Sequence, residues 1–181
     1  PPTVPSWFSE MLPLSFDLAM EINRLRRLME EKFAGNKSEQ EILSFIHDYL
    51  YVDEKAANSI YHYFYEQYNF SKIPSDNRIT IEHFVDRGRT YVLFNALFGR
   101  RVNDCLSRAL AFVIGRSQHR DVEIGVTDNG FYLAADQSFN AVRAFELLKQ
   151  EDFHSIVEQA IEKSEILSRR FRHCAARSLM I

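Results

Sequence analysis

Cysteine is scarce in this chain, and the sequence patterns that most often carry chemistry are missing. The two cysteines, Cys105 and Cys174, lie far apart in helical patterns, so we predict reduced, buried thiols rather than a disulfide framework. There is no GxxxxGK(S/T) phosphate loop and no DEAD-like box, which argues against ATP hydrolysis by this chain itself. GxSxG, CxxC and HExxH motifs are also absent, and the six histidines lack metal-ligand spacing. We therefore predict that this segment is not an enzyme and holds no cofactor.

Long apolar runs are missing as well. No stretch approaches the roughly 18 residues that cross a membrane, and nothing at the start resembles a signal peptide. Apolar residues make up 46% of the chain and charged residues 26%, which is typical of globular proteins. We expect a folded, intracellular protein with a cytoplasmic location and no membrane partner.

The net charge of −3 conceals an uneven distribution along the chain. The segment from Glu10 to Glu66 has eleven acidic residues against six lysines and arginines, a net charge of −5. Between Arg87 and Arg120 seven arginines stand against one acid, a net charge of +6, and segment 164–181 has a net charge of +3. A polyanion would therefore contact the second half of the chain. The alternative is that the two halves neutralise each other across an internal interface.

Segment 73–114 shows the clearest structural pattern. Alternating residues predict a half-buried strand at 79–85, and the apolar run 90–98 predicts a more buried one. Between them, residues 86–89 predict a turn in which Gly88 takes a positive φ. Gly99 ends the second strand and a helix is expected at 100–115, with a buried stripe formed by Val102, Cys105, Leu106, Ala109 and Val113.

Helical patterns flank this segment on both sides. Ser15, Ser38 and Asp53 are suitable caps for helices expected at 16–34, 37–51 and 54–69. A second hairpin is expected at 120–135, where Asn129-Gly130 is a strong turn signal. Three more helices are expected at 139–150, at 151–163 and from Ser164 onward, the last with a packed face formed by Ile166, Leu167, Phe171 and Cys174.

These elements predict an α+β fold in a single domain, residues 1–181. The N-terminal helices occupy residues 1–70. Residues 71–181 hold a small, mostly antiparallel sheet made of two β-hairpins, with helices packed over it.

The start of the helix after Gly99 is the best candidate for a phosphate contact. A helix N-terminus presents unpaired N–H groups to an anion, and Arg100, Arg101 and Asn103 stand in the same turn. At least one of the two arginines is expected to have no acidic partner. Arg108 is a further candidate, with the alternative that it pairs with Asp104 four residues earlier.

Acidic residues in the second hairpin raise the question of a metal-dependent nuclease. Asp128 is better explained by the turn, and Asp121 and Glu123 by alternation onto an exposed strand face. We therefore expect no metal site.

Three blocks resemble the large helicase-related (Lhr) family of superfamily 2 helicases: IPSDNRITIEHF at 73–84, FGRRVNDCLSRAL at 98–110 and RRFRHCAARSLMI at 169–181. More narrowly, they resemble the "DEAD/H-associated" region beyond the two motor domains and the winged helix of these proteins. Pro5-Ser6-Trp7 with Glu10 resembles the short entry to that region, although Ser9 stands where the family usually has glycine. The resemblance covers nearly the whole chain. Together with the uncapped ends, it leads us to expect a segment of a longer helicase.

The resemblance implies a function. Lhr-type proteins are ATP-dependent 3′-to-5′ translocases that unwind duplexes and have roles in DNA repair, and ATP and Mg²⁺ belong to motor domains that this chain lacks. This region would be an accessory domain that grips single-stranded DNA or RNA and buttresses the motor and winged-helix domains. Arg100, Arg101 and Asn103 would contact phosphates. Arg169 and Arg172 would contact the backbone or an adjoining domain, unless they form a solvated basic face.

Trp7, the only tryptophan, has two interpretations. Its indole either anchors the proline-rich N-terminal arm on the core, or stacks on an unpaired base, as aromatic rings do in single-strand channels. Two other functions also stay open. The arginines of a structural or protein-interaction module would dock the motor domains or another partner without touching nucleic acid. A stand-alone nuclease is the third hypothesis, and it predicts cleavage with Mg²⁺ or Mn²⁺.

Overall fold

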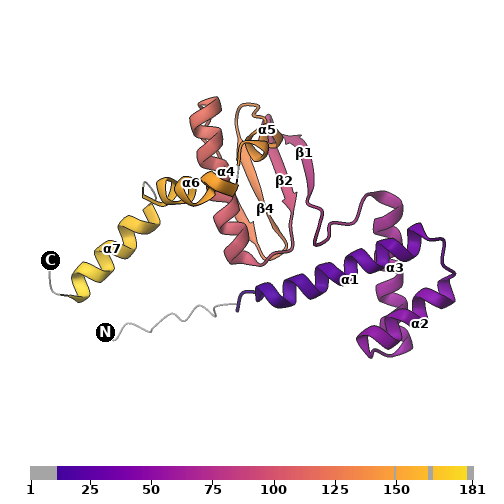
Figure 1. The fold of residues 1–181 in the computed structure, drawn as a ribbon. Coiled ribbons are helices and arrows are strands. Elements are labelled where there is room, and N and C mark those ends of the chain that lie inside the picture. The colour runs from indigo at the N-terminus through magenta and orange to yellow at the C-terminus, as the bar shows by residue number, and fades with distance from the viewer. Residues whose placement is uncertain (1–11, 149, 163–164, 179–181) are drawn as a thin grey trace, which may run out of the picture.

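In the computed structural model of the chain, residues 12–148, 150–162 and 165–178 are described. They form seven helices and four strands, which confirms the predicted α+β fold (Figure 1). In chain order the elements are α1 (Phe16–Ala34), α2 (Glu39–Leu50), α3 (Glu54–Phe70), β1 (Thr80–Asp86), β2 (Arg89–Asn95), α4 (Arg100–Gln118), β3 (Glu123–Thr127), β4 (Gly130–Ala135), α5 (Ala141–Glu146), α6 (Gln150–Glu162) and α7 (Glu165–Arg177).

Helices α1 to α3 form a helical lobe (residues 12–73) with its own core. Side-chain caps fix where its helices begin: Ser15 Oγ accepts a hydrogen bond from the Leu18 N–H, and Ser38 forms a reciprocal capping box with Glu41. The largest fully buried side chains of this core are Met29, Ile42, Ile46 and Ile73. The lobe therefore buries apolar surface independently of the sheet.

The four strands form one antiparallel sheet in the order β1-β2-β4-β3. Both predicted hairpins are present, and pairing between β2 and β4 joins them. The first hairpin turns at Arg87-Gly88, where both residues have a positive φ, as predicted for Gly88. Across the β2–β4 register Phe94 lies opposite Phe131 and Val92 lies opposite Leu133, so these side chains share one face of the sheet.

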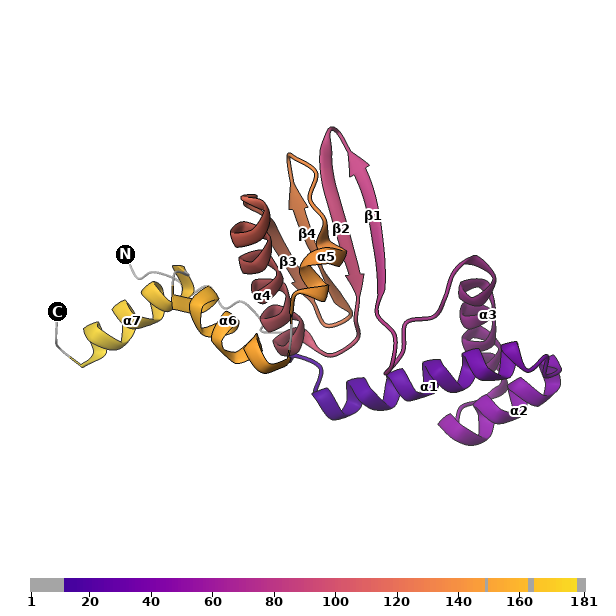
Figure 2. The same cartoon turned by 45° about the horizontal axis from the view of Figure 1, so that its top comes forward.

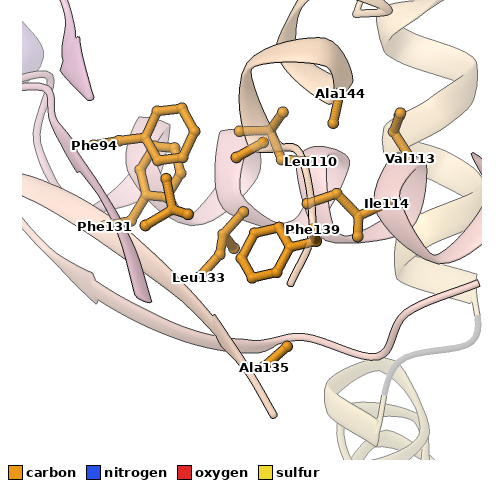
Figure 3. Close-up of a cluster of buried hydrophobic side chains, with 11 residues drawn as sticks. Phe94, Leu110, Val113, Ile114, Phe131, Leu133, Ala135, Phe139 and Ala144 are labelled. Atoms are coloured by element: carbon orange, nitrogen blue, oxygen red, sulfur yellow. The ribbon is translucent and has the colours of Figure 1, made fainter. Parts of the chain in front are cut away.

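Helices α4 and α5 cover that face and close the second core (Figures 1 and 2). Leu110, Val113 and Ile114 of α4 pack on the strand residues, and the rings of Phe94 and Phe131 stack with their centroids 4.6 Å apart (Figure 3). Burying aromatic and branched side chains at this density is the main contribution to the stability of such a layer.

The predicted buried stripe of α4 is only partly right. Ala109 and Val113 are buried as expected, whereas Val102, Cys105 and Leu106 are half-buried. The helix instead turns Asn103, Ser107, Leu110 and Ile114 fully inward. Because two of these residues are polar, hydrophobic periodicity alone placed the stripe about one residue away from its true position.

The opposite face of the sheet carries half-exposed aromatic side chains. The rings of Phe84 and Tyr91 stack across β1 and β2, with 5.1 Å between centroids. On the edge strand Gly125 lies beneath the ring of Tyr132, where a Cβ would come within 1.9 Å of Cε1. The missing side chain at Gly125 therefore makes room for the tyrosine.

Helix α1 joins the helical lobe to the sheet, passing below one end of it (Figure 2). Buried Asn23 donates a hydrogen bond through Nδ2 to the Leu97 carbonyl oxygen at 2.6 Å. Two ion pairs reinforce this junction: Arg27 with Asp76 at 3.1 Å, and Arg78 with Glu30. The three contacts involve one side of α1 and the segments that enter β1 and leave β2.

Helices α6 and α7 form an arm that leaves the sheet beside α4 (Figure 1). Here the sequence prediction was wrong, because Phe171 is 69% exposed, Leu167 is 43% exposed and Cys174 is exposed rather than buried. Of the α7 side chains that the structure describes, Ala175 is buried. The helix therefore presents an apolar stripe to solvent in this chain.

Candidate nucleic-acid interface

The basic residues of α4 follow a glycine corner that brings the strand into the helix. Gly99 has a φ of 83°, and a Cβ there would lie 2.7 Å from the Leu14 carbonyl oxygen. Glycine is thus required both by its backbone conformation and by the close approach of the chain. The corner places Arg100 and Arg101 in the first turn of α4, where both are exposed.

Arg100, Arg101 and Arg108 lie together on one side of α4. They line a groove of about 670 Å³ whose other wall is apolar and comes from Val122, Ile124 and Val126 in or beside β3. Among the described residues neither Arg100 nor Arg101 has an ion pair, which agrees with the prediction that at least one is unpaired. Two unpaired guanidinium groups beside a groove suit a polyanion.

Arg108 is less available than the other two arginines. Its Nη2 lies 2.9 Å from Asp104 Oδ1, which is the i,i+4 pairing that the sequence offered as the alternative. Asp104 also lines the groove. The groove therefore holds one neutralised pair beside two uncompensated positive charges.

The helix N-terminus itself already holds an anionic group. Asp128, in the turn between β3 and β4, accepts through Oδ1 from the Arg100 N–H at 2.9 Å and from the Leu14 N–H at 3.1 Å. This carboxylate is favourably placed at the positive end of the helix dipole. An incoming phosphate at this corner would therefore meet the arginine side chains, while the first N–H of the helix is occupied.

Asn103 requires a correction, because it is fully buried and its amide nitrogen is committed to backbone carbonyl groups. Its Nδ2 donates to the carbonyl oxygens of Ala96, Thr127 and Asp128 at 2.9–3.1 Å. The side chain ties the start of α4 to the loop after β2 and to the β3–β4 turn. With no surface to offer a phosphate, it is not part of the interface.

The remaining predicted residues are not brought to this groove. Arg169 and Arg172 are exposed on α7, and Arg172 Nε donates to the Ser168 carbonyl oxygen at 3.4 Å. They lie on the arm that extends away from the sheet (Figure 1). Trp7 lies outside the described residues.

One cationic side chain that the sequence reasoning did not consider is Arg26 on α1. It lines a cavity between the helical lobe and the sheet. Burial lowers the pKa of its guanidinium. No local pattern singles this arginine out, because Glu30 stands four residues later as an apparent partner.

No cluster of three or more histidine, cysteine, aspartate or glutamate side chains able to hold a metal ion is found in the described part of the chain. Within the same residues, no helix is both long and apolar enough to cross a membrane.

A comparison with protein families decides where the chain belongs. The family model described as DEAD/H associated matches residues 73–181, which is more than half of the chain. The chain belongs to the DEAD/H associated family. The matched region begins at the entry to β1 and includes the sheet, α4 and the arm.

Relatives of this DEAD/H associated chain confirm the resemblance to Lhr proteins. ATP-dependent helicase Lhr-Core of Methanothermobacter thermautotrophicus is 52% identical over 182 residues, and that of Saccharolobus solfataricus is 44% identical over 187. These alignments cover 100% and 99% of this chain, which spans 21% of each relative. The chain therefore corresponds to about a fifth of the curated relatives' length.

A solved structure shares the fold. The structure of Mycobacterium smegmatis helicase Lhr bound to ssDNA and AMP-PNP superposes with a TM-score of 0.75 at 20% identity, covering 99% of this DEAD/H associated chain and 22% of that protein.

Proposed function

We propose that this chain is an accessory domain of an Lhr-type ATP-dependent DNA helicase, and that it grips single-stranded nucleic acid through the arginine side of α4. The observation that carries the proposal is the groove in which exposed, unpaired Arg100 and Arg101 face an apolar wall. Phosphate contacts of this kind give affinity without base preference, which suits a protein that moves along a strand.

The comparisons support this proposal at the level of the family. The relatives are named ATP-dependent helicases, and the solved Lhr structure was bound to ssDNA. ATP and Mg²⁺ would be bound by motor domains outside this chain. A role in DNA repair and a cytoplasmic location stay predictions of the resemblance. We place Arg169 and Arg172 as contacts to the strand or to a neighbouring domain.

A direct test measures binding of a fluorescein-labelled dT oligonucleotide by anisotropy at about 50 mM and about 200 mM salt. Replacing Arg100 and Arg101 by alanine should weaken binding at least tenfold at the lower salt. It should also reduce the slope of log affinity against log salt by roughly 0.7 for each phosphate that the variant no longer neutralises.

The control removes the same charge elsewhere. Arg87→Ala with Arg143→Ala deletes two exposed arginines, at the tip of the first hairpin and on α5. If both double variants weaken binding equally, net charge rather than the α4 groove is responsible, and the proposed site is wrong.

A second candidate function rests on the exposed apolar stripe of α7, formed by Leu167 and Phe171. Such a stripe fits the docking of a motor or winged-helix domain of the same protein. If the wild-type chain shows no strand binding at either salt but assembles with separately expressed motor domains, docking is the better assignment. Loss of that assembly in Phe171→Ser would then locate the contact.

A further inference from the structure

A second cavity lies where the helical lobe meets the sheet, on a different part of the molecule from the α4 groove. Its volume is about 250 Å³. Helices α1 and α3, strands β1 and β2 and the β3–β4 turn all contribute to it, and its polar lining consists of Arg26, Gln67, Thr80, Glu82, Asn95 and Asn129. A cavity with this many polar groups suits a polar ligand.

The arginines of α1 differ in their partners. Arg24 pairs with Glu21, and Arg27 pairs with both Glu31 and Asp76. Arg26 has no ion pair or side-chain hydrogen bond among the described residues. Glu30, which stands four residues later and could have paired with it, is bound instead by Arg78 from the segment before β1.

The position of Arg26 makes this lack of a partner significant. Its side chain is half-buried, and burial lowers the pKa of the guanidinium. A desolvated charge is unfavourable unless another group compensates it. An exposed arginine would be hydrated, whereas a half-buried one that lines a cavity leaves room for an anion beside its charge.

The other polar groups of the cavity include side-chain amides whose N–H groups are available as hydrogen-bond donors. The side-chain amides of Gln67 and Asn129 make no hydrogen bond to other described residues, so both can donate to a ligand. Glu82 is the one acid in the lining, and its carboxylate accepts from Asn95 Nδ2 at 2.9 Å. Guanidinium and amide N–H groups together are the donors that phosphate oxygens accept.

We propose that this junction cavity binds a phosphate group, with Arg26 as the counter-charge and the amides of Gln67 and Asn129 as further donors. Tyr63 lines the same cavity and is 61% exposed. Its ring offers a stacking face to a base, which favours a nucleotide of a strand over free phosphate as the source. That choice of source rests on the proposed function, whereas the phosphate site does not.

The site is tested with Arg26→Met, and Arg24→Met is the matched control because it removes an exposed arginine from the same helix. Inorganic phosphate is titrated into ¹⁵N-labelled protein at constant ionic strength, and the arginine Nε–H resonances are followed. We expect a saturable shift that is lost in Arg26→Met and kept in Arg24→Met. A shift that survives Arg26→Met overturns the proposal, as does the absence of any saturable shift in the wild type.

Thermal unfolding separates ligand binding from a structural role. Arg26→Met should unfold at the same temperature as the wild type or at a higher one, because it removes an uncompensated charge and keeps an apolar stem. A midpoint several degrees lower would mean that Arg26 has a stabilising internal partner, which contradicts the proposal.

Binding of the dT oligonucleotide then identifies the source of the phosphate. If Arg26→Met weakens strand binding at least fivefold relative to Arg24→Met, the phosphate belongs to a strand. If Arg26→Met and Arg24→Met bind the strand equally, while the resonance shift caused by inorganic phosphate still depends on Arg26, the cavity binds free phosphate. The paired α4 variants judge the proposed function separately, because they leave the junction cavity intact.

Discussion

At the scale of single residues, Asn103 is a structural cross-link between three segments. Replacing it by alanine would remove all three of these hydrogen bonds from the start of α4, although the Ala96 and Asp128 carbonyl oxygens keep bonds from the Phe98 and Gly99 N–H groups. We expect Asn103→Ala to lower the free energy of unfolding by about 2–4 kcal/mol, measured by urea denaturation. Strand affinity at temperatures where the variant is folded should be unchanged. A variant with wild-type stability but weakened strand binding would restore Asn103 to the interface.

Gly99 offers a matched pair of substitutions with Gly88. Both have a φ near +82°, but a Cβ meets nothing within 4 Å at Gly88, whereas at Gly99 it meets the Leu14 carbonyl oxygen. Gly88→Ala should cost about 1 kcal/mol of unfolding free energy from backbone strain alone, and Gly99→Ala at least about 2 kcal/mol. Equal losses in chemical denaturation would mean that the Leu14 contact relaxes without cost.

The pKa of Glu41 leads to a prediction about how the free energy of unfolding changes in acid. The Ser38 backbone N–H, with help from Lys37 and the Ser38 hydroxyl, lowers the pKa of its carboxyl from 4.5 to about 2. Because the pKa is lower in the folded chain than in the unfolded one, the ionised Glu41 carboxylate stabilises the fold. This contribution is complete above pH 4.5 and is lost as the pH falls toward 2. Stability measured by urea should therefore fall less steeply over that window in Glu41→Gln than in Glu39→Gln, a control in the same turn. Parallel curves would contradict this prediction.

At the scale of elements, α7 and the sheet should respond differently to the same substitution. Phe131→Ala removes a ring that is 2% exposed in the core and should cost about 3–5 kcal/mol. Phe171→Ala removes a largely exposed ring and should change the unfolding free energy by less than about 0.5 kcal/mol. Denaturation of the two variants side by side checks this. A large loss for Phe171→Ala would show that the arm packs in solution.

Elements with strong local signals were predictable from the sequence. The bounds of α1 match because Ser15 caps its start and the Gly35-Asn36 pair follows its end, and the second hairpin turns where Asn129-Gly130 indicated. The helix expected at 139–150 is instead the short α5, capped by Asn140, followed by α6 from Gln150. Two helices were therefore predicted here as observed, but the first ends about four residues earlier than expected, at Glu146.

Features that depend on tertiary structure were less predictable. From the sequence, Asn103 was interpreted as a phosphate ligand. Its burial could not be predicted, because the Thr127 and Asp128 carbonyl groups that it contacts belong to a segment far along the chain. Arg26 did not stand out in the sequence, because Glu30 four residues later is its expected partner. In the structure Glu30 pairs instead with Arg78, which is 48 residues away in the sequence. The place of Arg100 and Arg101 in the first turn of α4 was predictable because a glycine corner followed by charged residues is a local pattern.

At the scale of the whole molecule, the junction should make the helical lobe and the sheet unfold together. Asn23, Arg27 and Arg78 connect α1 to the segments around the sheet. We expect a single thermal transition for the wild type, with helix loss followed by circular dichroism coinciding with calorimetry.

Removing a junction contact should make the helical lobe and the sheet unfold less cooperatively. Asn23→Ala leaves the Leu97 carbonyl oxygen without its donor, and we expect it to lower the midpoint and broaden or split the transition. Arg24→Ala, on the exposed side of α1, should unfold like the wild type. A single sharp transition in Asn23→Ala at the wild-type midpoint would show that the lobes are coupled by other contacts.

The contact between Asp128 and Leu14 also has a consequence for the order in which the chain becomes structured during synthesis. The two residues are 114 positions apart. Helices α1 to α3 can form from nearby residues as the chain leaves the ribosome, since their contacts close short loops. The hydrogen bond from the Leu14 N–H can form only after the β3–β4 turn, which contains Asp128, has been synthesised. The entrance to the first helix is thus completed only after most of the chain has been translated.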